Sequence, residues 1–371
     1  MLIQNKDENT SPYTSMADAY MAKGLYDKAE EVLEHYLHEF SDNAVIRQWL
    51  AIGYLIQARY DLALNELEKS LLIDPTNYFN QLLKGEIFRL KGNFVEAEKE
   101  FFKVLDFEEE IAHFWSRSSL ASLYLGMGKF EKSNEQLIMG KELGDKLGER
   151  GGESGWYLER TYRHLRSGEP EKALEESIKA ERTAVEWGCV YCHQKRALVY
   201  KGVSYLALNS LEDAQNTADE LKEITLKEMN EKFMRYYYYL MGRIAINNNN
   251  ISMAIDYLEK GISLLPSQNS YMILSEQAFF IDPLAQAYYE AGEMDKARET
   301  YNRINRLTLG RLWWGDIYVK SFYMLGKIWE QKGDTAKATE HYEKYLDHWK
   351  DADPGIPEVA DARKRLAGLQ K

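Results

Sequence analysis

Cysteine and proline are scarce in this 371-residue chain, which contains only 2 Cys and 7 Pro. Two cysteines cannot build the disulfide framework of a small secreted scaffold. No tract rich in Pro, Ser or Gly is long enough to serve as an interdomain linker. Because 371 residues exceed the size at which one core keeps growing, we expect either several domains or stacked repeats. The composition favours stacked helical repeats.

Long apolar runs and an excess of positive charge are also missing. No run approaches the roughly 18 apolar residues of a membrane span, and the first residues, MLIQNKDENTSPYTS, lack the pattern of a secretory signal. The 59 acidic residues outnumber the 47 basic ones, which gives a formal charge of -12. Such a charge repels phosphate backbones and anionic lipids. We therefore expect a cytoplasmic protein that binds neither nucleic acid nor a membrane.

A repeated pattern of small residues runs through the chain. Two segments of 29 residues, which start at Tyr13 and Arg47, align without a gap 34 residues apart. A small residue then recurs at nine positions, namely Ala29, Ala63, Ala97, Ser133, Ala173, Ala214, Ala254, Ala297 and Ala338. The successive spacings are first 34 to 36 residues and later 40 to 43.

A second series of small residues precedes the first by twelve positions each time. Its members are Ala17, Ala51, Gly85, Ala121, Thr161, Gly202, Gly242, Ala285 and Gly326. Small side chains allow two helices to cross closely, so the paired series predicts nine helical hairpins. Glycines seven residues after several members of this series, such as Gly24 and Gly292, predict the turns. In the run Asn247 to Asn250, asparagine is expected to take the left-handed conformation instead.

The pattern resembles that of the tetratricopeptide repeat (TPR) family over roughly residues 11 to 350. The resemblance implies an all-α, right-handed α-solenoid of about nine hairpins. We expect a disordered N-terminus at 1–11, repeats one to four at 12–145, a Gly-rich loop at 146–155, repeats five to nine at 156–350 and a capping helix at 351–371. The longer later repeats are similar to the TPR arrays that follow kinase or cyclase domains in bacterial signalling proteins.

The family generally binds peptides or protein segments in a concave groove that is lined by the first helices. Its inner-face positions lie six and three residues before the small residue, and one and four after it. In repeats seven to nine these positions nominate Tyr236, Tyr239, Arg243, Gln286, Tyr289, Tyr323 and Lys327 for partner binding. Tyr and Arg provide large contact areas at low entropic cost. The alternative is that these side chains only pack successive hairpins together.

No catalytic constellation is recognisable in the sequence. The 7 His residues form no HExxH motif, and no Gly-rich phosphate loop or kinase motif occurs. The segment GCVYCH places Cys189, Cys192 and His193 in a CxxCH pattern, which is typical of covalent haem c attachment. Three interpretations remain open for it: buried structural thiols, a redox-active or metal-binding CxxC, and a haem c site. We expect no cofactor, with haem c as the alternative.

Three functions follow from this reading of the sequence. The first is a non-catalytic scaffold that binds a peptide or protein in its groove. The second is the ligand-responsive sensor portion of a bacterial signalling protein. The third is a haem or redox protein that depends on Cys189 and Cys192. The sequence does not determine the identity of the partner or the oligomeric state.

Overall fold

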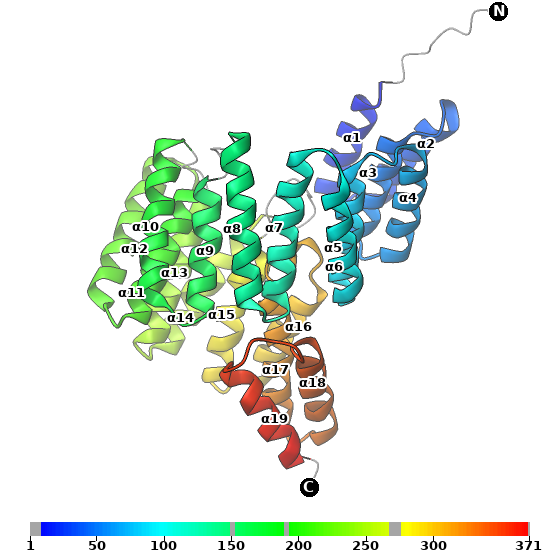
Figure 1. Ribbon diagram of the computed structural model, residues 1–371. Coiled ribbons are helices and arrows are strands. Elements are labelled where there is room, and N and C mark those ends of the chain that lie inside the picture. Colours follow the sequence, from blue (N-terminus) through cyan, green and yellow to red (C-terminus); the bar gives the residue numbers. More distant parts are fainter. Residues whose placement is uncertain (1–8, 149–152, 189–192, 267–275, 370–371) are drawn as a thin grey trace, which may run out of the picture. The chain divides into compact units, whose positions relative to one another are not determined.

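The computed structural model describes residues 9–148, 153–188, 193–266 and 276–369, and the secondary structure of these residues is entirely helical (Figure 1). Eighteen α-helices follow one another as nine hairpins, and one further helix ends the chain. The hairpins are α1 (Ser11–Ala22) with α2 (Tyr26–Glu39), α3 (Ala44–Ile56) with α4 (Tyr60–Ile73), α5 (Tyr78–Leu90) with α6 (Phe94–Lys103), α7 (Glu110–Gly126) with α8 (Phe130–Leu147), α9 (Glu153–Arg166) with α10 (Pro170–Glu186), α11 (Lys195–Ala207) with α12 (Leu211–Lys227), α13 (Met234–Asn247) with α14 (Ile251–Ser263), α15 (Gln277–Glu290) with α16 (Met294–Arg306), and α17 (Gly315–Gln331) with α18 (Thr335–His348). The last helix is α19 (Pro357–Leu369).

The small residues that defined the repeat lie where the two helices of each hairpin meet. All nine members of the second-helix series are at most 1% exposed. The first-helix series is buried as well, including Thr161, whose hydroxyl donates a hydrogen bond to the carbonyl of Tyr157 one turn earlier (2.7 Å). That bond satisfies the polar group that distinguishes repeat five from the others. The prediction of nine hairpins and an all-α solenoid is confirmed.

The turn inside each hairpin uses one residue in the left-handed conformation. This residue always lies seven positions after the first-helix small residue, with φ between 56° and 81°. Six turns use glycine, and the others use Ala58, Asn209 and Asn249. Glycine adopts this conformation without steric cost, and asparagine tolerates it. The predicted left-handed asparagine in the run 247–250 is therefore Asn249.

Gly242 shows how closely the helices of a hairpin approach each other. A Cβ atom at this position of α13 would lie 2.6 Å from Cγ of Leu258 in α14. Gly242→Ala is expected to destabilise the protein by about 1–3 kcal/mol, because the packed hairpin must open to accept one carbon. At Gly368 in α19, by contrast, an added Cβ atom would have no neighbour within 4 Å. Gly368→Ala is the control and should be neutral or stabilising by up to about 1 kcal/mol. Equal urea-unfolding midpoints for Gly242→Ala and the parent protein would contradict the packing argument.

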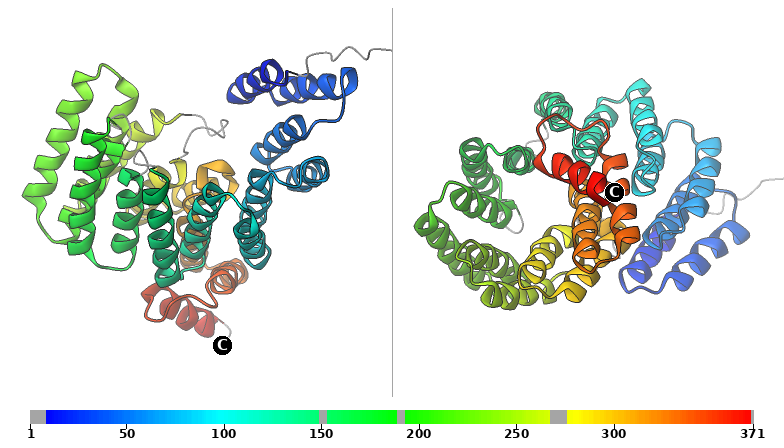
Figure 2. Two further views of the ribbon diagram at one scale, coloured as in Figure 1. Left: turned by 45° about the horizontal axis from the view of Figure 1, so that its top comes forward. Right: turned by 90° about the horizontal axis from the view of Figure 1, so that it is seen from below.

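The helices belong to two compact units. The described part of the first unit comprises residues 9–119, 266 and 308–312, and the second comprises the other described residues. The boundary at 119/120 lies within α7, whereas the sequence placed the change in repeat length at 146–155. Residues 1–8 and 149–152 lie outside the described residues, so the predicted disordered terminus and Gly-rich loop stay largely predictions. Two further views follow the chain from hairpin to hairpin (Figure 2).

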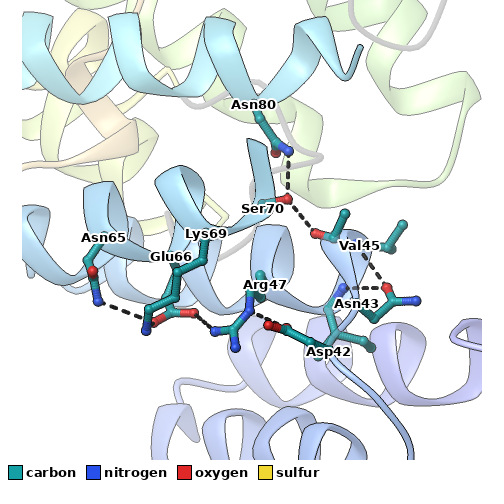
Figure 3. A network of polar contacts seen from close by, with 11 residues as sticks. Asp42, Asn43, Val45, Arg47, Asn65, Glu66, Lys69, Ser70 and Asn80 are labelled. Carbon is teal, nitrogen blue, oxygen red and sulfur yellow. Dashed lines mark hydrogen bonds and ion pairs between the residues drawn. The ribbon is translucent and has the colours of Figure 1, made fainter. Parts of the chain in front are cut away.

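In the first unit, a polar network links α3, α4 and the start of α5 (Figure 3). Arg47 forms ion pairs with Asp42 and with Glu66 of α4, the latter at 2.6 Å. Ser70 donates a hydrogen bond to the carbonyl of Ala44 (2.7 Å) and accepts one from the side chain of Asn80 (2.8 Å). These bonds satisfy buried polar groups where successive hairpins stack.

The short segment Thr308–Leu312 also belongs to the first unit, although it follows α16 in the chain. The hydroxyl of Thr308 donates to the carbonyl of Ile56 (3.1 Å), and Arg311 donates to the carbonyl of Leu90 (2.8 Å). Both carbonyls lie in the last turn of a first helix, where α-helices leave acceptors unsatisfied. This contact spans more than two hundred residues of sequence.

In the second unit, the end of the array packs against its fourth hairpin, at a contact that we call the seam. The indole nitrogen of Trp349 donates to the carbonyl of Gly126 (2.9 Å). The backbone of Asp353 donates to the carbonyl of Gly128 (3.0 Å), while its carboxylate accepts from the backbone of Glu131 (3.1 Å). The seam thus brings residues more than 220 positions apart in the chain into contact.

The extra residues of the later repeats are used in two ways. In repeats five and six they lengthen the second helices, because α10 and α12 each contain 17 residues, whereas α2 and α4 contain 14. The second helices of repeats seven to nine contain only 13 or 14 residues. The extra residues of these repeats therefore lie in α17 and in the connections between helices. Among the described residues, no helix combines the length and apolar character required to cross a membrane.

Candidate binding cavity in the second unit

A cavity of about 320 Å³ lies within the second unit. Its walls come from five successive first helices, α9, α11, α13, α15 and α17. Aliphatic side chains, namely Leu165, Val203, Leu206, Ile246 and Ile317, form much of the wall. Pockets of this volume and mixed lining are typical of sites for small ligands or side chains. The cavity is therefore our candidate functional site.

Stacked aromatic rings form one side of the cavity. The rings of Tyr239 and Phe279 are stacked with centroids 4.4 Å apart and planes 16° apart. Phe279 also packs on Trp314 (4.8 Å), which in turn meets the ring of Tyr162 edge-on (5.1 Å). Such pairs stabilise beyond their buried area and hold each ring in place. This side of the cavity is accordingly rigid before any ligand binds.

Charged side chains also line the cavity. Arg166 of α9 forms an ion pair with the fully buried Asp316 of α17 (2.7 Å), and Asp316 also accepts a hydrogen bond from the hydroxyl of Tyr162 (2.8 Å). Burial lowers the pKa of Arg166, but Asp316 and further acidic groups outweigh this, so the net shift is upward. Arg166 therefore stays charged and tied to α17.

Arg243 and Asp282 are the other two charged residues of the lining. Among the described residues, neither takes part in an ion pair. Arg243 makes a 3.4 Å hydrogen bond to the hydroxyl of Tyr239. Nearby Lys320 of α17 has a pKa that is lowered by burial and by Arg166, and raised in part by Asp282. Two polar groups of opposite charge are thus available to a ligand.

The inner-face rule accounts for much of this lining. The positions one and four after the small residue hold Tyr162 and Leu165 in repeat five, Val203 and Leu206 in repeat six, and Arg243 and Ile246 in repeat seven. All six line the cavity. The sequence prediction nominated partner-binding residues only in repeats seven to nine, and so left out the side chains of α9 and α11. The same arithmetic, extended two repeats earlier, would have found these side chains.

The seven nominated residues are not all at one site. Tyr239 and Arg243 line the cavity. Tyr236 lies in the interior, 1% exposed, and donates a hydrogen bond to Glu276 (2.7 Å), which also accepts two from Arg196. Tyr236 does not line the cavity, and its side chain packs between hairpins, which agrees with the alternative interpretation of these residues.

The other four lie together near the C-terminal end of the array. The ammonium group of Lys327 is 5.0 Å from the ring centre of Tyr289 and 5.5 Å from that of Tyr323. Tyr323 donates to Asp361 of α19 (2.7 Å), and Gln286 donates to Glu290 (2.8 Å). Helix α19 thus covers part of this inner face. Partner binding by any of the seven stays a prediction.

Cys189 and Cys192 lie outside the described residues. His193 follows them, and its Nδ1 lies 2.6 Å from the hydroxyl of Ser154. Burial and the charge of Arg196 lower the pKa of His193 to about 4, which keeps the ring neutral at pH 7. In the described part of the chain, no three His, Cys, Asp or Glu residues are grouped to hold a metal ion.

A second hollow of about 540 Å³ lies beside the seam, and three of its polar side chains, Glu169, Lys172 and His164, bond to one another. Glu169 bonds to Lys172 and to His164, the latter at 2.8 Å. These two bonds lower the pKa of Glu169. Because these charges already have partners, the hollow is a weaker candidate than the cavity between the first helices.

Comparison with known proteins finds repeat models that match four parts of the chain. Models described as tetratricopeptide repeats match residues 236–268, 284–306 and 319–347, which correspond to the last three hairpins. A model described as a PPR repeat matches residues 11–36, the first hairpin. A TPR repeat-containing protein of Methanocaldococcus jannaschii is 21% identical over 360 residues. That alignment covers 93% of this chain and 57% of the relative, so the chain spans little more than half of that protein.

The solved structures that the comparison matched share little sequence with this chain. A Rap protein complexed with competence and sporulation factor is 11% identical with a TM-score of 0.47, and 98% of each chain is covered. The Cut9–Hcn1 hetero-tetramer of the APC/C is 15% identical with a TM-score of 0.41, covering 94% of this chain and 62% of the other. A tetratricopeptide repeat protein from Parabacteroides merdae is 15% identical with a TM-score of 0.39, and the match covers 88% of this chain and 99% of the other.

The segments that match the tetratricopeptide models coincide with the last three hairpins. The two series of small residues define the same register in all nine hairpins. The last three hairpins therefore match tetratricopeptide repeats, and the sequence pattern of small residues continues through the other six hairpins.

Proposed function

We propose that this chain is a non-catalytic cytoplasmic scaffold that binds a peptide or protein segment in the cavity of its second unit. The observation that carries the proposal is the lining of that cavity by five successive first helices. A partner segment that lies across these helices contacts each one in turn. Rigid aromatic rings and an arginine at the same place are the side chains that dominate binding energy at interfaces.

Blocking the cavity tests this proposal. Ile246 lies on its wall, so Ile246→Trp should fill part of the space and abolish peptide binding. The assay is selection from a random peptide display library on the full chain, read as enrichment over a bare surface. The matched control is Met253→Trp on α14 of the same hairpin, where the side chain is exposed. Circular dichroism should show equal helix content in both variants. Equal enrichment on Ile246→Trp and on the parent protein would contradict the proposed site.

A second candidate is that the chain is the sensor portion of a larger signalling protein. Its coverage of only 57% of the relative from Methanocaldococcus jannaschii supports this possibility. It requires a catalytic or DNA-binding domain in the same reading frame or in a neighbouring gene. Sequencing the complete frame and its neighbours tests the candidate, and their lack of such a domain would exclude it.

We propose further that the scaffold works without a cofactor. The neutral ring of His193 already bonds to Ser154 through Nδ1, which fits a structural role. An absorbance scan and an intact-mass measurement test the proposal. We expect a colourless protein at its calculated mass, whereas a Soret band with added haem mass would establish the CxxCH segment as a haem site.

A further inference from the structure

The charges around the cavity are unevenly matched. Asp316 is paired with Arg166. Asp282 and Glu358 lie near enough to Arg166 and Lys320 to act on both of these cations. Within the described residues, no ion pair includes Arg243. Arg243 is therefore the cation in the cavity that lacks a carboxylate partner.

The surroundings of Arg243 are apolar and aromatic. Its guanidinium bonds to the hydroxyl of Tyr239, whose ring stacks on Phe279. Ile246 lies one helical turn further along α13 and also faces the cavity. A guanidinium beside an apolar wall strengthens a charge-assisted hydrogen bond, because water competes less for both partners.

We propose that the cavity selects a peptide segment in which an aspartate or glutamate stands next to an apolar residue. The peptide carboxylate bonds to Arg243, and the neighbouring apolar side chain packs on Tyr239, Phe279 and Ile246. Asp282 and the exposed side chain of Asn247 are then available to the N–H and C=O groups of the peptide backbone. This inference rests on the proposed peptide-binding function and names its ligand class.

Other ligand classes fit the cavity less well. A lysine or arginine of the peptide would face Arg243, and like charges in a partly dehydrated site repel strongly. A phosphorylated side chain carries up to two negative charges and would face Asp282 in the same cavity. Of the arginines that line the cavity, Arg243 has no ion pair within the described part of the chain, and a single carboxylate balances its charge.

Peptide selection with charge-reversed variants tests the specificity. A random library displayed to the full chain should enrich Asp or Glu beside Leu, Ile, Val or Phe. On Arg243→Glu the acidic preference should disappear and Lys or Arg should be enriched at the same position. Arg182→Glu changes an exposed arginine of α10 in the same unit and should leave the selected motif unchanged.

A synthetic peptide of the enriched motif gives the quantitative test by fluorescence anisotropy. Arg243→Ala should weaken its binding by about 10- to 100-fold, the usual effect of losing a charge-assisted hydrogen bond. Replacing the peptide glutamate by glutamine should weaken binding by the same factor. Combined with Arg243→Ala, this replacement should cause no further loss of affinity, because both changes remove the same interaction. A phosphoserine peptide of the same sequence should bind more weakly than the glutamate peptide.

The outcomes separate the two proposals. If the parent protein enriches no peptide, the proposed peptide-binding function itself is wrong. If Ile246→Trp abolishes enrichment, the cavity is the peptide-binding site. If the enriched peptides then lack an acidic residue, or if Arg243→Glu selects the same motif, the proposed acidic specificity is wrong. Tighter binding of the phosphoserine peptide would overturn it as well.

Discussion

Asp316→Ala is expected to destabilise the second unit by about 3–5 kcal/mol, the usual cost of removing one partner of a buried ion pair. The carboxylate of Asp316 is fully buried in α17, where it is paired with Arg166 and accepts a hydrogen bond from Tyr162. Its loss removes the carboxylate that lies 2.7 Å from the guanidinium of Arg166, and the guanidinium stays charged. Because both partners belong to α9, the change should loosen the contact between α9 and α17 in particular.

Urea unfolding combined with hydrogen exchange measures this effect. Repeat arrays do not always unfold in one step, so exchange rates resolved by helix are needed alongside the overall midpoint. We expect faster exchange in α9 and α17 and little change in the first unit. Asp295→Ala is the control, because Asp295 is largely exposed and its ion pair with Lys332 should contribute little to stability. Equal costs for the two substitutions would contradict the buried-pair argument.

Trp349→Ala should have the other large effect, a loss of about 3–5 kcal/mol that is typical of removing a buried tryptophan from a core. Trp349 is 2% exposed, packs against Phe130 and Tyr345, and donates to the carbonyl of Gly126. It is the largest side chain at the seam between the fourth and ninth hairpins. Its removal should therefore free the end of the array from α8.

Two further variants separate the causes of this loss. Trp349→Phe keeps an aromatic ring but leaves the carbonyl of Gly126 without its donor, so it should cost less than the alanine variant. Trp187→Ala removes a half-exposed tryptophan at the end of α10 and should cost about 1 kcal/mol or less. Hydrogen exchange in α7, α8 and α18 is the readout. Unchanged protection of these helices in Trp349→Ala would show that the seam does not hold the unit together.

Local structure was predictable because each hairpin repeats the same local requirements. Close helix crossing requires a small residue, as at Gly242, and the turn seven residues later requires a residue that tolerates positive φ, as at Asn249. Ala58 takes the same conformation without being glycine or asparagine, and no sequence rule for turns would have selected it. In that repeat, the packing of the hairpin overrides the local preference.

The candidate site was predictable only in part. The inner-face rule nominated Tyr239 and Arg243, and both line the cavity, because the side-chain direction of a helical residue follows from its position in the helix. It placed Tyr236 on the same face, yet Glu276 and Arg196 enclose that side chain. Glu276 precedes α15, so its position depends on the stacking of hairpins, which the rule does not describe.

The sequence by itself determined the helical-repeat architecture, the number of hairpins, their register and most of the left-handed turns, since these depend on contacts within one hairpin or between neighbours. Only the tertiary structure decided which inner faces enclose a cavity, because that depends on small rotations accumulated over many repeats. The pairing of Arg166 with Asp316 and of Trp349 with Gly126 arises in this way, between residues about 150 and 220 positions apart. The Arg166–Asp316 pair takes up one cation of the cavity, and Arg243 has no ion pair among the residues that the structure describes.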